Sequence, residues 1–485
     1  MLNDIYQSTK EYINSMPKNI RKKYGQFFTD INTAKYMSNF FDLDGIGEIV
    51  RVLDPGAGTG ILSCALLERL EKDKKIKKIE LVCYENDIRI LSLLEKNLKC
   101  MKDNIQLELE YSIINEDYIL NQNFDSPDLT FDLIIGNPPY LKISSSSKEA
   151  VHMKKICYGA PNLYFLFLAM SINNLEDDAE LVYIIPRSWT SGIYFEKFRE
   201  YMLSKTTIEK IHLFVSRKKV FNSENILQET IIIHLRKGKK NKKNICIYSS
   251  NEDCDIFDAT CEKIPYNIVV NLNGYIFLPT CEDEIKVLNI VSKFSSTLIK
   301  NDMKMKTGLV VDFRNRELLF SNPAKNRVPI IYGQNIKDGE IKFPIKEKPN
   351  YISNEKKGLI QRNSNYLIIK RFSSKEEQRR LQCAILKKDY FSNYDYISTQ
   401  NKVNFITGIN HDLTLNEVFG LYCLFNSTIY DTYYRILNGT TQVNSTELNK
   451  IPIPNINTIK LIGERIKKLK NLSVKNCDKV LEEFI

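Results

Sequence analysis

The residues best suited to chemistry follow a short apolar run and are Asn137, Pro138, Pro139 and Tyr140. The two prolines have no N–H group and a fixed φ, so this loop is stiff and rich in free carbonyls. Asn137 adds a side-chain acceptor and two donors, and Tyr140 adds a flat aromatic face. A rigid pair of acceptors beside a stacking ring suits one task, which is holding a flat heterocycle by its exocyclic NH2 group. The simpler interpretation is a polar turn after a strand, and the upstream sequence decides against it.

A glycine-rich stretch lies upstream of this loop. The apolar run 49–53 predicts a strand, and Asp54 follows it, before glycines at 56, 58 and 60 and a helical pattern over 61–70. Gly56 and Gly58 would let a ligand approach the backbone at a helix N-terminus. Their spacing departs from the dinucleotide pattern Gly-x-Gly-x-x-Gly, which disfavours NAD. Followed by the Asn-Pro-Pro-Tyr loop, the stretch resembles the S-adenosylmethionine loop of amino-methyltransferases.

Two acids end the next predicted strands. Glu85 closes the run 80–85, where a carboxylate can accept both hydroxyls of a ribose. Asp117 follows a third strand at 107–113 and could accept the amino group of an adenine, with Tyr118 as an apolar wall. Either acid alone would usually be a solvated strand-end residue. In this order we expect both to be cofactor ligands.

Strand and helix patterns alternate through the first half of the chain, which predicts an α/β fold with a mostly parallel, doubly wound sheet. Strands at 208–215 and 230–235, separated only by a loop, predict an antiparallel edge hairpin. We expect three segments: an N-terminal lead-in at 1–23, a catalytic domain at 24–243 and a mixed α+β domain at 244–485. In the last segment basic and aromatic residues are interleaved, which suits contacts to nucleic acid.

Composition narrows the class of protein further. A chain of 485 residues with 43% hydrophobic residues has ample material for two or three cores, and its net charge of +10 mildly favours a polyanionic partner. The eleven cysteines form no Cys-x-x-Cys pair and the four histidines no ligand-spaced cluster, so we expect no metal. We find no signal segment and no long apolar run, so we expect a soluble, cytoplasmic protein with no membrane association.

These motifs, in this order, resemble those of the gamma class of N6-adenine DNA methyltransferases, the TaqI-like enzymes of restriction–modification systems. The stretch 25–29 is similar to the N-terminal cofactor motif of that class, 54–60 to its glycine motif and 137–140 to its catalytic motif. Val220 and Phe221 are similar to a late motif whose Phe packs on the flipped base. The stretches 441–444 and 451–454 are similar to the PstI/BsuBI branch.

The resemblance implies a Rossmann-like catalytic domain followed by a DNA target-recognition domain. It implies S-adenosyl-L-methionine as methyl donor and double-stranded DNA as partner, which would keep the protein at the nucleoid, with any cognate restriction endonuclease acting separately. The residues expected at the site fall into three groups: Asn137, Pro138 and Tyr140 for catalysis; Thr29, Asp54, Gly56, Gly58, Glu85 and Asp117 for the cofactor; Tyr140 and Phe221 for stacking on the base.

Other functions remain open at this point. N4-cytosine methyltransferases use a related loop, usually with Ser in place of Asn137. Glutamine methyltransferases acting on release factors also contain Asn-Pro-Pro-Tyr, in shorter chains without a large basic C-terminal half. A sequence-specific DNA-binding protein with an inactive methyltransferase fold is the non-enzymatic alternative, and the intact catalytic loop argues against it. The first 23 residues are too few for a fused nuclease domain.

Overall fold

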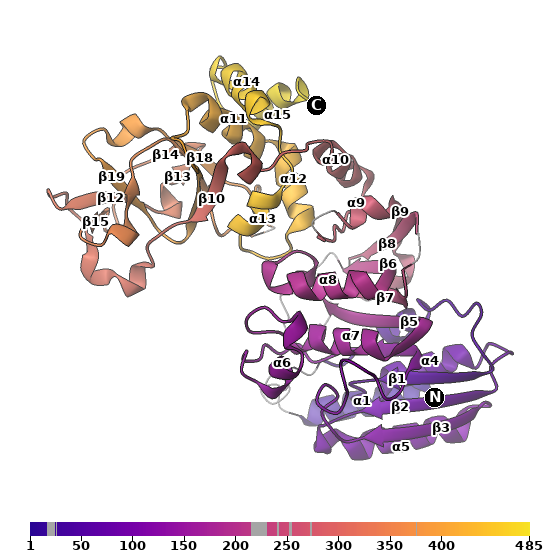
Figure 1. The fold of residues 1–485 in the computed structure, drawn as a ribbon. Coiled ribbons are helices and arrows are strands. Elements are labelled where there is room, and N and C mark those ends of the chain that lie inside the picture. The colour runs from indigo at the N-terminus through magenta and orange to yellow at the C-terminus, as the bar shows by residue number, and fades with distance from the viewer. Residues whose placement is uncertain are drawn as a thin grey trace. The chain divides into compact units, whose positions relative to one another are not determined.

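A computed structural model describes residues 1–16, 25, 27–214, 230–239, 242–251, 255–271, 274–374 and 376–485. The chain divides into two compact units, Met1–Thr280 and Cys281–Ile485 (Figure 1).

The first unit is built on one large sheet. Among the described residues it has nine strands in the order β3-β2-β1-β4-β5-β7-β6-β8-β9. The strands are β1 Ile49–Asp54, β2 Lys78–Tyr84, β3 Glu108–Ile114, β4 Phe131–Gly136, β5 Leu175–Pro186, β6 Thr206–Phe214, β7 Thr230–Lys237, β8 Asn244–Ser250 and β9 Thr260–Pro265. Strands β3 to β5 in this order are all parallel, whereas β7 is antiparallel to both β5 and β6. The predicted mostly parallel α/β sheet is confirmed.

Helices connect and cover these strands. They are α1 Leu2–Ser15, α3 Ile31–Ser38, α4 Ile61–Leu70, α5 Ile88–Asn104, α6 Lys148–His152, α7 Leu163–Asn174, α8 Glu196–Lys205 and α9 Tyr266–Val269. Apolar residues of α1, α3, α4 and α5 form one buried cluster with the sheet. Helix α7 packs against β5 and α8. The pattern of α7 is apolar on all sides, and ten of its twelve residues are buried, which is how a fully enclosed helix differs from an amphipathic one.

The end of the sheet differs from the prediction. Strands β6 and β7 do pair antiparallel, but they are not the edge, because β8 lies parallel to β6 and β9 pairs antiparallel with β8. The compact unit continues to Thr280, rather than ending near residue 243. The lysine-rich stretch after β7 is therefore a connection within the first unit and not the boundary between units.

The second unit contains two smaller sheets. Among the described residues one has the order β10-β20-β17-β18-β14-β13 and the other β11-β15-β12-β19-β16. Their strands are β10 Met303–Thr307, β11 Leu319–Phe320, β12 Arg327–Ile331, β13 Ile336–Lys337, β14 Glu340–Ile341, β15 Tyr351–Ser353, β16 Gln361–Arg362, β17 Tyr366–Lys370, β18 Cys383–Leu386, β19 Tyr396–Thr399 and β20 Val403–Gly408. The helices are α10 Glu282–Ser292, α11 Leu415–Phe425, α12 Thr428–Leu437, α13 Ser445–Lys450, α14 Ile456–Lys467 and α15 Val474–Glu482. This is the mixed α+β architecture expected for the C-terminal half.

Close packing in the first sheet requires a glycine at position 136, the last residue of β4. A Cβ atom added there would lie 2.6 Å from Cε1 of Tyr183, whose ring is fully buried in β5. We expect Gly136→Ala to lower the free energy of unfolding by about 1–3 kcal/mol through overpacking. Urea denaturation measures this, with Gly358→Ala as the control, because nothing lies within 4 Å of its added Cβ. Equal stability of the two variants would contradict the steric argument.

Candidate functional site

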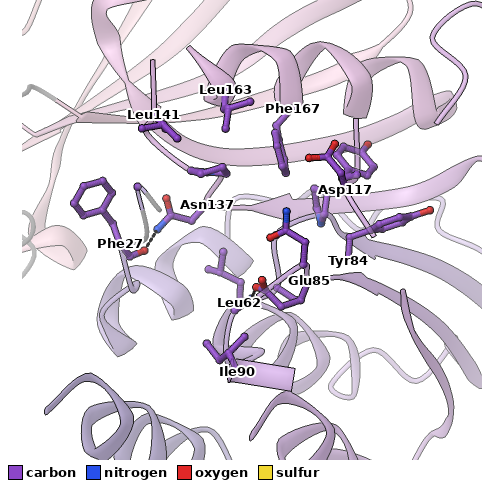
Figure 2. Close-up of a pocket in the computed structure, with 18 of the residues that line it drawn as sticks. Phe27, Leu62, Tyr84, Glu85, Ile90, Asp117, Asn137, Leu141, Leu163 and Phe167 are labelled. Carbon is purple, nitrogen blue, oxygen red and sulfur yellow. Dashed lines mark hydrogen bonds between the residues drawn. The ribbon is translucent and has the colours of Figure 1, made fainter. Parts of the chain in front are cut away.

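A pocket of about 390 Å³ lies at the carboxyl ends of the parallel strands (Figure 2). Its lining comes from the glycine loop after β1, the end of β2, the loops after β3 and β4, and helix α7. Six of the residues expected at the site line it: Thr29, Gly56, Gly58, Glu85, Asp117 and Asn137. Parallel strands place their carboxyl ends at one sheet edge, which is why residues so far apart in sequence meet here.

The glycine loop takes the tight path that its sequence indicates. Gly58 and Gly60 have φ angles of +55° and +82°, a region that residues with a Cβ rarely adopt. The loop is fixed from behind through Thr59. Its hydroxyl accepts a hydrogen bond from Thr9 of α1 at 2.7 Å, and its carbonyl accepts one from Asn97 of α5 at 2.8 Å. The N-terminal lead-in is therefore part of the wall that supports the pocket.

Glu85 joins the glycine loop to the next helix. One carboxylate oxygen accepts from the N–H of Gly58 at 2.9 Å, and the other accepts from the N–H of Asp87 at 2.8 Å. Burial raises the pKa of Glu85, while these backbone hydrogen bonds oppose the rise. Each carboxylate oxygen has a second lone pair, so the group can still accept hydrogen bonds from the hydroxyls of a ligand in the pocket.

Asp54 is placed differently from the prediction. Its carboxyl is fully buried below the loop and is not among the lining residues. The Ser63 hydroxyl donates to it at 2.7 Å, which links the end of β1 to α4. Burial raises the pKa of Asp54 to about 7. The structure gives Asp54 a role in holding the loop, and the cofactor contact expected of it stays a prediction.

The far wall of the pocket is aromatic. Tyr118 is buried and donates its hydroxyl to Asn174 at 3.0 Å, and its ring lies 5.3 Å from that of Phe167 and 5.1 Å from that of Tyr84. Asp117 lies beside it, with one oxygen accepting from the N–H of Leu120 at 3.0 Å, and burial raises its pKa. A carboxylate next to flat apolar rings fits the amino group of a bound heterocycle, as the sequence indicates.

The nitrogen and the oxygen of the Asn137 side-chain amide differ in their hydrogen bonding. Its nitrogen donates to the Phe27 carbonyl at 2.8 Å (Figure 2). The same nitrogen also donates to the Thr29 hydroxyl at 3.0 Å. Its Oδ1 is buried and has no hydrogen-bond partner among the described residues. Because buried polar atoms are usually satisfied, an unpaired acceptor aligned by two donor bonds marks a place for a ligand's N–H group.

Tyr140 is held in a fixed orientation beside this amide. Its hydroxyl donates to the Ile184 carbonyl at 3.0 Å, its N–H donates to the Gly25 carbonyl at 3.1 Å, and its ring centroid lies 5.2 Å from that of Phe27. Pro138 is buried. Tyr140 is not among the lining residues of the pocket, so any stacking on its ring would occur beside the pocket and not within it.

The structure adds residues that sequence reasoning did not single out. Phe28, Glu149, Leu163 and Phe167 line the pocket, and Thr9 supports its floor. The place of Phe28 next to Thr29 in the 25–29 motif could have suggested it, whereas no local signal distinguishes Glu149 or Thr9. Phe221, expected to stack on the base, lies outside the described residues, as do Val220 and Gln26.

The residues that the structure describes contain no group of three or more His, Cys, Asp or Glu side chains arranged to hold a metal ion. None of their helices is both long enough and apolar enough to cross a bilayer.

Comparison with known proteins agrees with this geometry. Residues 68–221 match the model of the Eco57I restriction-modification methylase family. Type II methyltransferase M.PstI of Providencia stuartii is 34% identical over 483 residues, covering 96% of this chain and 94% of the relative. Type II methyltransferase M.BsuBI of Bacillus subtilis is 32% identical over 494 residues, covering 98% and 96%. The structure of the restriction–modification enzyme MmeI in complex with DNA shares the fold, with a TM-score of 0.56 at 14% identity over 100% of this chain and 73% of MmeI.

Fold, pocket and relatives together define a DNA methyltransferase of restriction–modification systems. Within that class the chain belongs to the type II methyltransferases of the branch that contains M.PstI and M.BsuBI.

Proposed function

We propose that this protein transfers a methyl group from S-adenosyl-L-methionine to the N6 amino group of an adenine extruded from duplex DNA. The observation that supports adenine N6 most directly is the amide of Asn137. Two hydrogen bonds turn its nitrogen away, which leaves Oδ1 as a buried acceptor at the pocket. An exocyclic NH2 group is the complementary partner.

The pocket residues suit the methyl donor on chemical grounds. The glycine loop admits close backbone approach at the N-terminus of α4, Glu85 can accept ribose hydroxyls, and Asp117 beside Tyr118 can hold an adenine ring. S-adenosylmethionine would supply an electrophilic sulfonium methyl group. The residues of this chain need only position it against the target nitrogen, because methyl transfer is an in-line displacement.

Asn137 and Pro138 would act on the nucleophile. The lone pair of adenine N6 is delocalised into the ring, which makes this nitrogen a poor nucleophile. If Asn137 Oδ1 and the Pro138 carbonyl accept its two N–H bonds, a more pyramidal nitrogen with a localised lone pair is favoured. The Asn137 amide is aligned before the reaction by its two donor bonds, so its Oδ1 stabilises developing positive charge on nitrogen without reorganising.

Extrusion of the base must be offset by new contacts. Unstacking costs a few kcal/mol, and base–aromatic stacking contributes about 1–3 kcal/mol per contact. We assign this role to Tyr140, whose ring is fixed by its hydrogen bond to Ile184, and to Phe221. We assign the choice of target sequence to the C-terminal unit. A cognate endonuclease would be a separate protein.

Sequencing of modified bases in DNA from cells expressing the chain tests the proposal. N6-methyladenine at one recurring sequence, absent from cells expressing Asn137→Ala, is the expected result. N4-methylcytosine would replace the adenine assignment with the cytosine alternative. Cofactor binding without any modified base would favour an inactive methyltransferase fold.

Thr29 gives a prediction of its own, because its hydroxyl accepts from the catalytic amide. We expect Thr29→Val to lower kcat about 5- to 10-fold, the effect of losing one hydrogen bond of about 1 kcal/mol, with little change in KM for DNA. Thr29→Ser keeps the hydroxyl and should restore turnover. Steady-state kinetics on both substrates measures this. A higher KM for S-adenosylmethionine at unchanged kcat would instead assign Thr29 to the cofactor, as the sequence motif implies.

A further inference from the structure

Two segments of the second unit, about 70 residues apart in sequence, lie side by side. Phe372 and Gln442 form an antiparallel bridge. The N–H of Ser373 donates to the Thr441 carbonyl at 3.0 Å, and the N–H of Val443 donates to the Arg371 carbonyl at 2.7 Å. Arg371, Phe372 and Gln442 are here called the Arg371 patch. Gln442 belongs to the polar stretch 441–444, none of whose residues lines the pocket of the first unit.

The guanidinium of Arg371 is held in place by neutral groups. Its Nη1 donates to the Asn401 carbonyl at 2.9 Å. The Gln442 side-chain amide is oriented so that its oxygen faces the guanidinium. This oxygen accepts from Nε of Arg371 at 3.1 Å and from Nη2 at 2.6 Å. No carboxylate of the described residues forms an ion pair with Arg371, although the side chain is partly buried and burial lowers its pKa.

This arrangement leaves donors available for a ligand. A guanidinium has five N–H bonds in a rigid planar fork, and the three contacts above use three of them. The remaining two belong to Nη1 and Nη2. The Phe372 ring, 48% exposed, lies 5.6 Å from the guanidinium. The patch therefore presents a fixed cation with spare donors next to an exposed aromatic face.

A buried network makes the patch rigid. Arg380, with no exposed surface, donates to the Ser373 carbonyl on one segment and to the Thr440 carbonyl on the other, the latter at 2.6 Å. Asp431 accepts from the backbone N–H groups of Arg380 and Leu381 at 2.8 Å each. Burying charged side chains costs free energy, whereas apolar contacts could join the two segments without that cost. A rigid support beneath a partly exposed fork is the arrangement that precise recognition requires.

We propose that Arg371 reads a guanine in the major groove of the target DNA, donating to its O6 and N7, with Gln442 as the positioning residue that orients the guanidinium. Guanine presents two adjacent acceptors in that groove, and the bidentate contact from Arg is the commonest specific base contact. A phosphate can also accept from two donors of the fork, and the test separates the two ligands, because only a base contact depends on one particular guanine. This inference rests on the proposed function, since it takes duplex DNA as the substrate.

The test begins with the target site defined by sequencing of modified DNA. Duplexes are then prepared in which each guanine of the site is replaced in turn by 7-deazaguanine, which lacks the N7 acceptor. We expect one replacement to lower kcat/KM of the wild-type protein about 10- to 150-fold, the range for losing one hydrogen bond to a charged group. The same replacement should have no further effect on Arg371→Ala. Because the effect of 7-deazaguanine is also measured with the wild-type protein, the result does not depend only on the stability of Arg371→Ala.

Matched variants complete the design. Arg362→Ala removes an arginine of the same unit that is 71% exposed, and it should keep full sensitivity to 7-deazaguanine. Gln442→Ala should weaken discrimination at the same position only. A uniform loss across all duplexes in Arg371→Ala, unchanged discrimination, or a target site without guanine would each overturn the proposal. Methylation by the wild-type protein is measured alongside, so failure of the proposed function is seen separately.

Discussion

Asn137→Ala is expected to lower the single-turnover rate of methyl transfer about 100- to 1,000-fold, the usual effect of removing one preorganised electrostatic contact. The affinities for DNA and for S-adenosylmethionine should change little. The reason is that Oδ1 of Asn137 interacts most strongly with the amino group as positive charge develops on it, so the loss falls on the transition state. The structure supports this view, because Nδ2 of Asn137 donates both of its hydrogen bonds within the protein, whereas Oδ1 has no partner among the described residues.

Two readouts separate chemistry from base capture. Single-turnover methylation reports the rate, and 2-aminopurine at the target position reports extrusion, because its emission rises on leaving the stack and falls beside an aromatic ring. Asn173→Ala, which removes a half-buried asparagine of α7 bonded to the Asn123 carbonyl and outside the pocket lining, is the control. Tyr140→Ala should change the emission signal while some methylation remains. A wild-type rate in Asn137→Ala would restore the interpretation of this loop as a simple turn.

Glu85→Ala is expected to weaken binding of S-adenosylmethionine about 100-fold, equivalent to about 2.8 kcal/mol. The variant would lose the predicted ribose contacts and also the two backbone hydrogen bonds that tie Gly58 and Asp87 together. Hydrogen bonds to a charged group contribute about 1.5–3 kcal/mol each, so the loss is large even with partial compensation by water.

Calorimetric titration with S-adenosylmethionine measures this effect. Glu80→Ala is the matched control, because Glu80 lies on the same strand but faces solvent and pairs with Lys78. Glu85→Gln keeps the shape and one acceptor, so its affinity should fall between those of wild type and Glu85→Ala. An unchanged dissociation constant in a folded Glu85→Ala protein would show that the acid is not a cofactor ligand.

The sequence predicted best those features that depend on one strand and the loop after it. Gly58, Glu85 and Asn137 each follow an apolar run, and parallel pairing brings such strand ends together whatever the details of packing. Hydrogen bonds between residues of one unit that lie far apart in the sequence have no such local signal. The hydrogen bond from Asn137 to Thr29 joins residues 108 positions apart, and only the folded chain shows it.

The connection between β7 and β8 and the place of Asp54 could not be predicted from the composition or pattern of the sequence. The lysine-rich stretch after β7 has the composition of a linker, yet β8 pairs with β6 beyond it, because a charged turn can connect strands of one sheet. The acid at position 54 follows a strand in the same manner as Glu85, but its contact with Ser63 draws it beneath the loop. Composition and pattern do not distinguish these two acids, whereas the folded structure does, because only Glu85 lines the pocket.

The extension of the first sheet through β8 and β9 has a consequence for the inheritance of specificity. Among related genes, a recombination event within codons 251–259 would join the first eight strands of one parent to β9 of another, and the six paired positions between β8 and β9 would have to match by chance. Recombination after codon 280 would transmit an intact catalytic sheet together with a complete second unit. The fold therefore favours shuffling at the later junction, where exchange of the second unit, to which we assign the choice of target, leaves the first sheet unchanged.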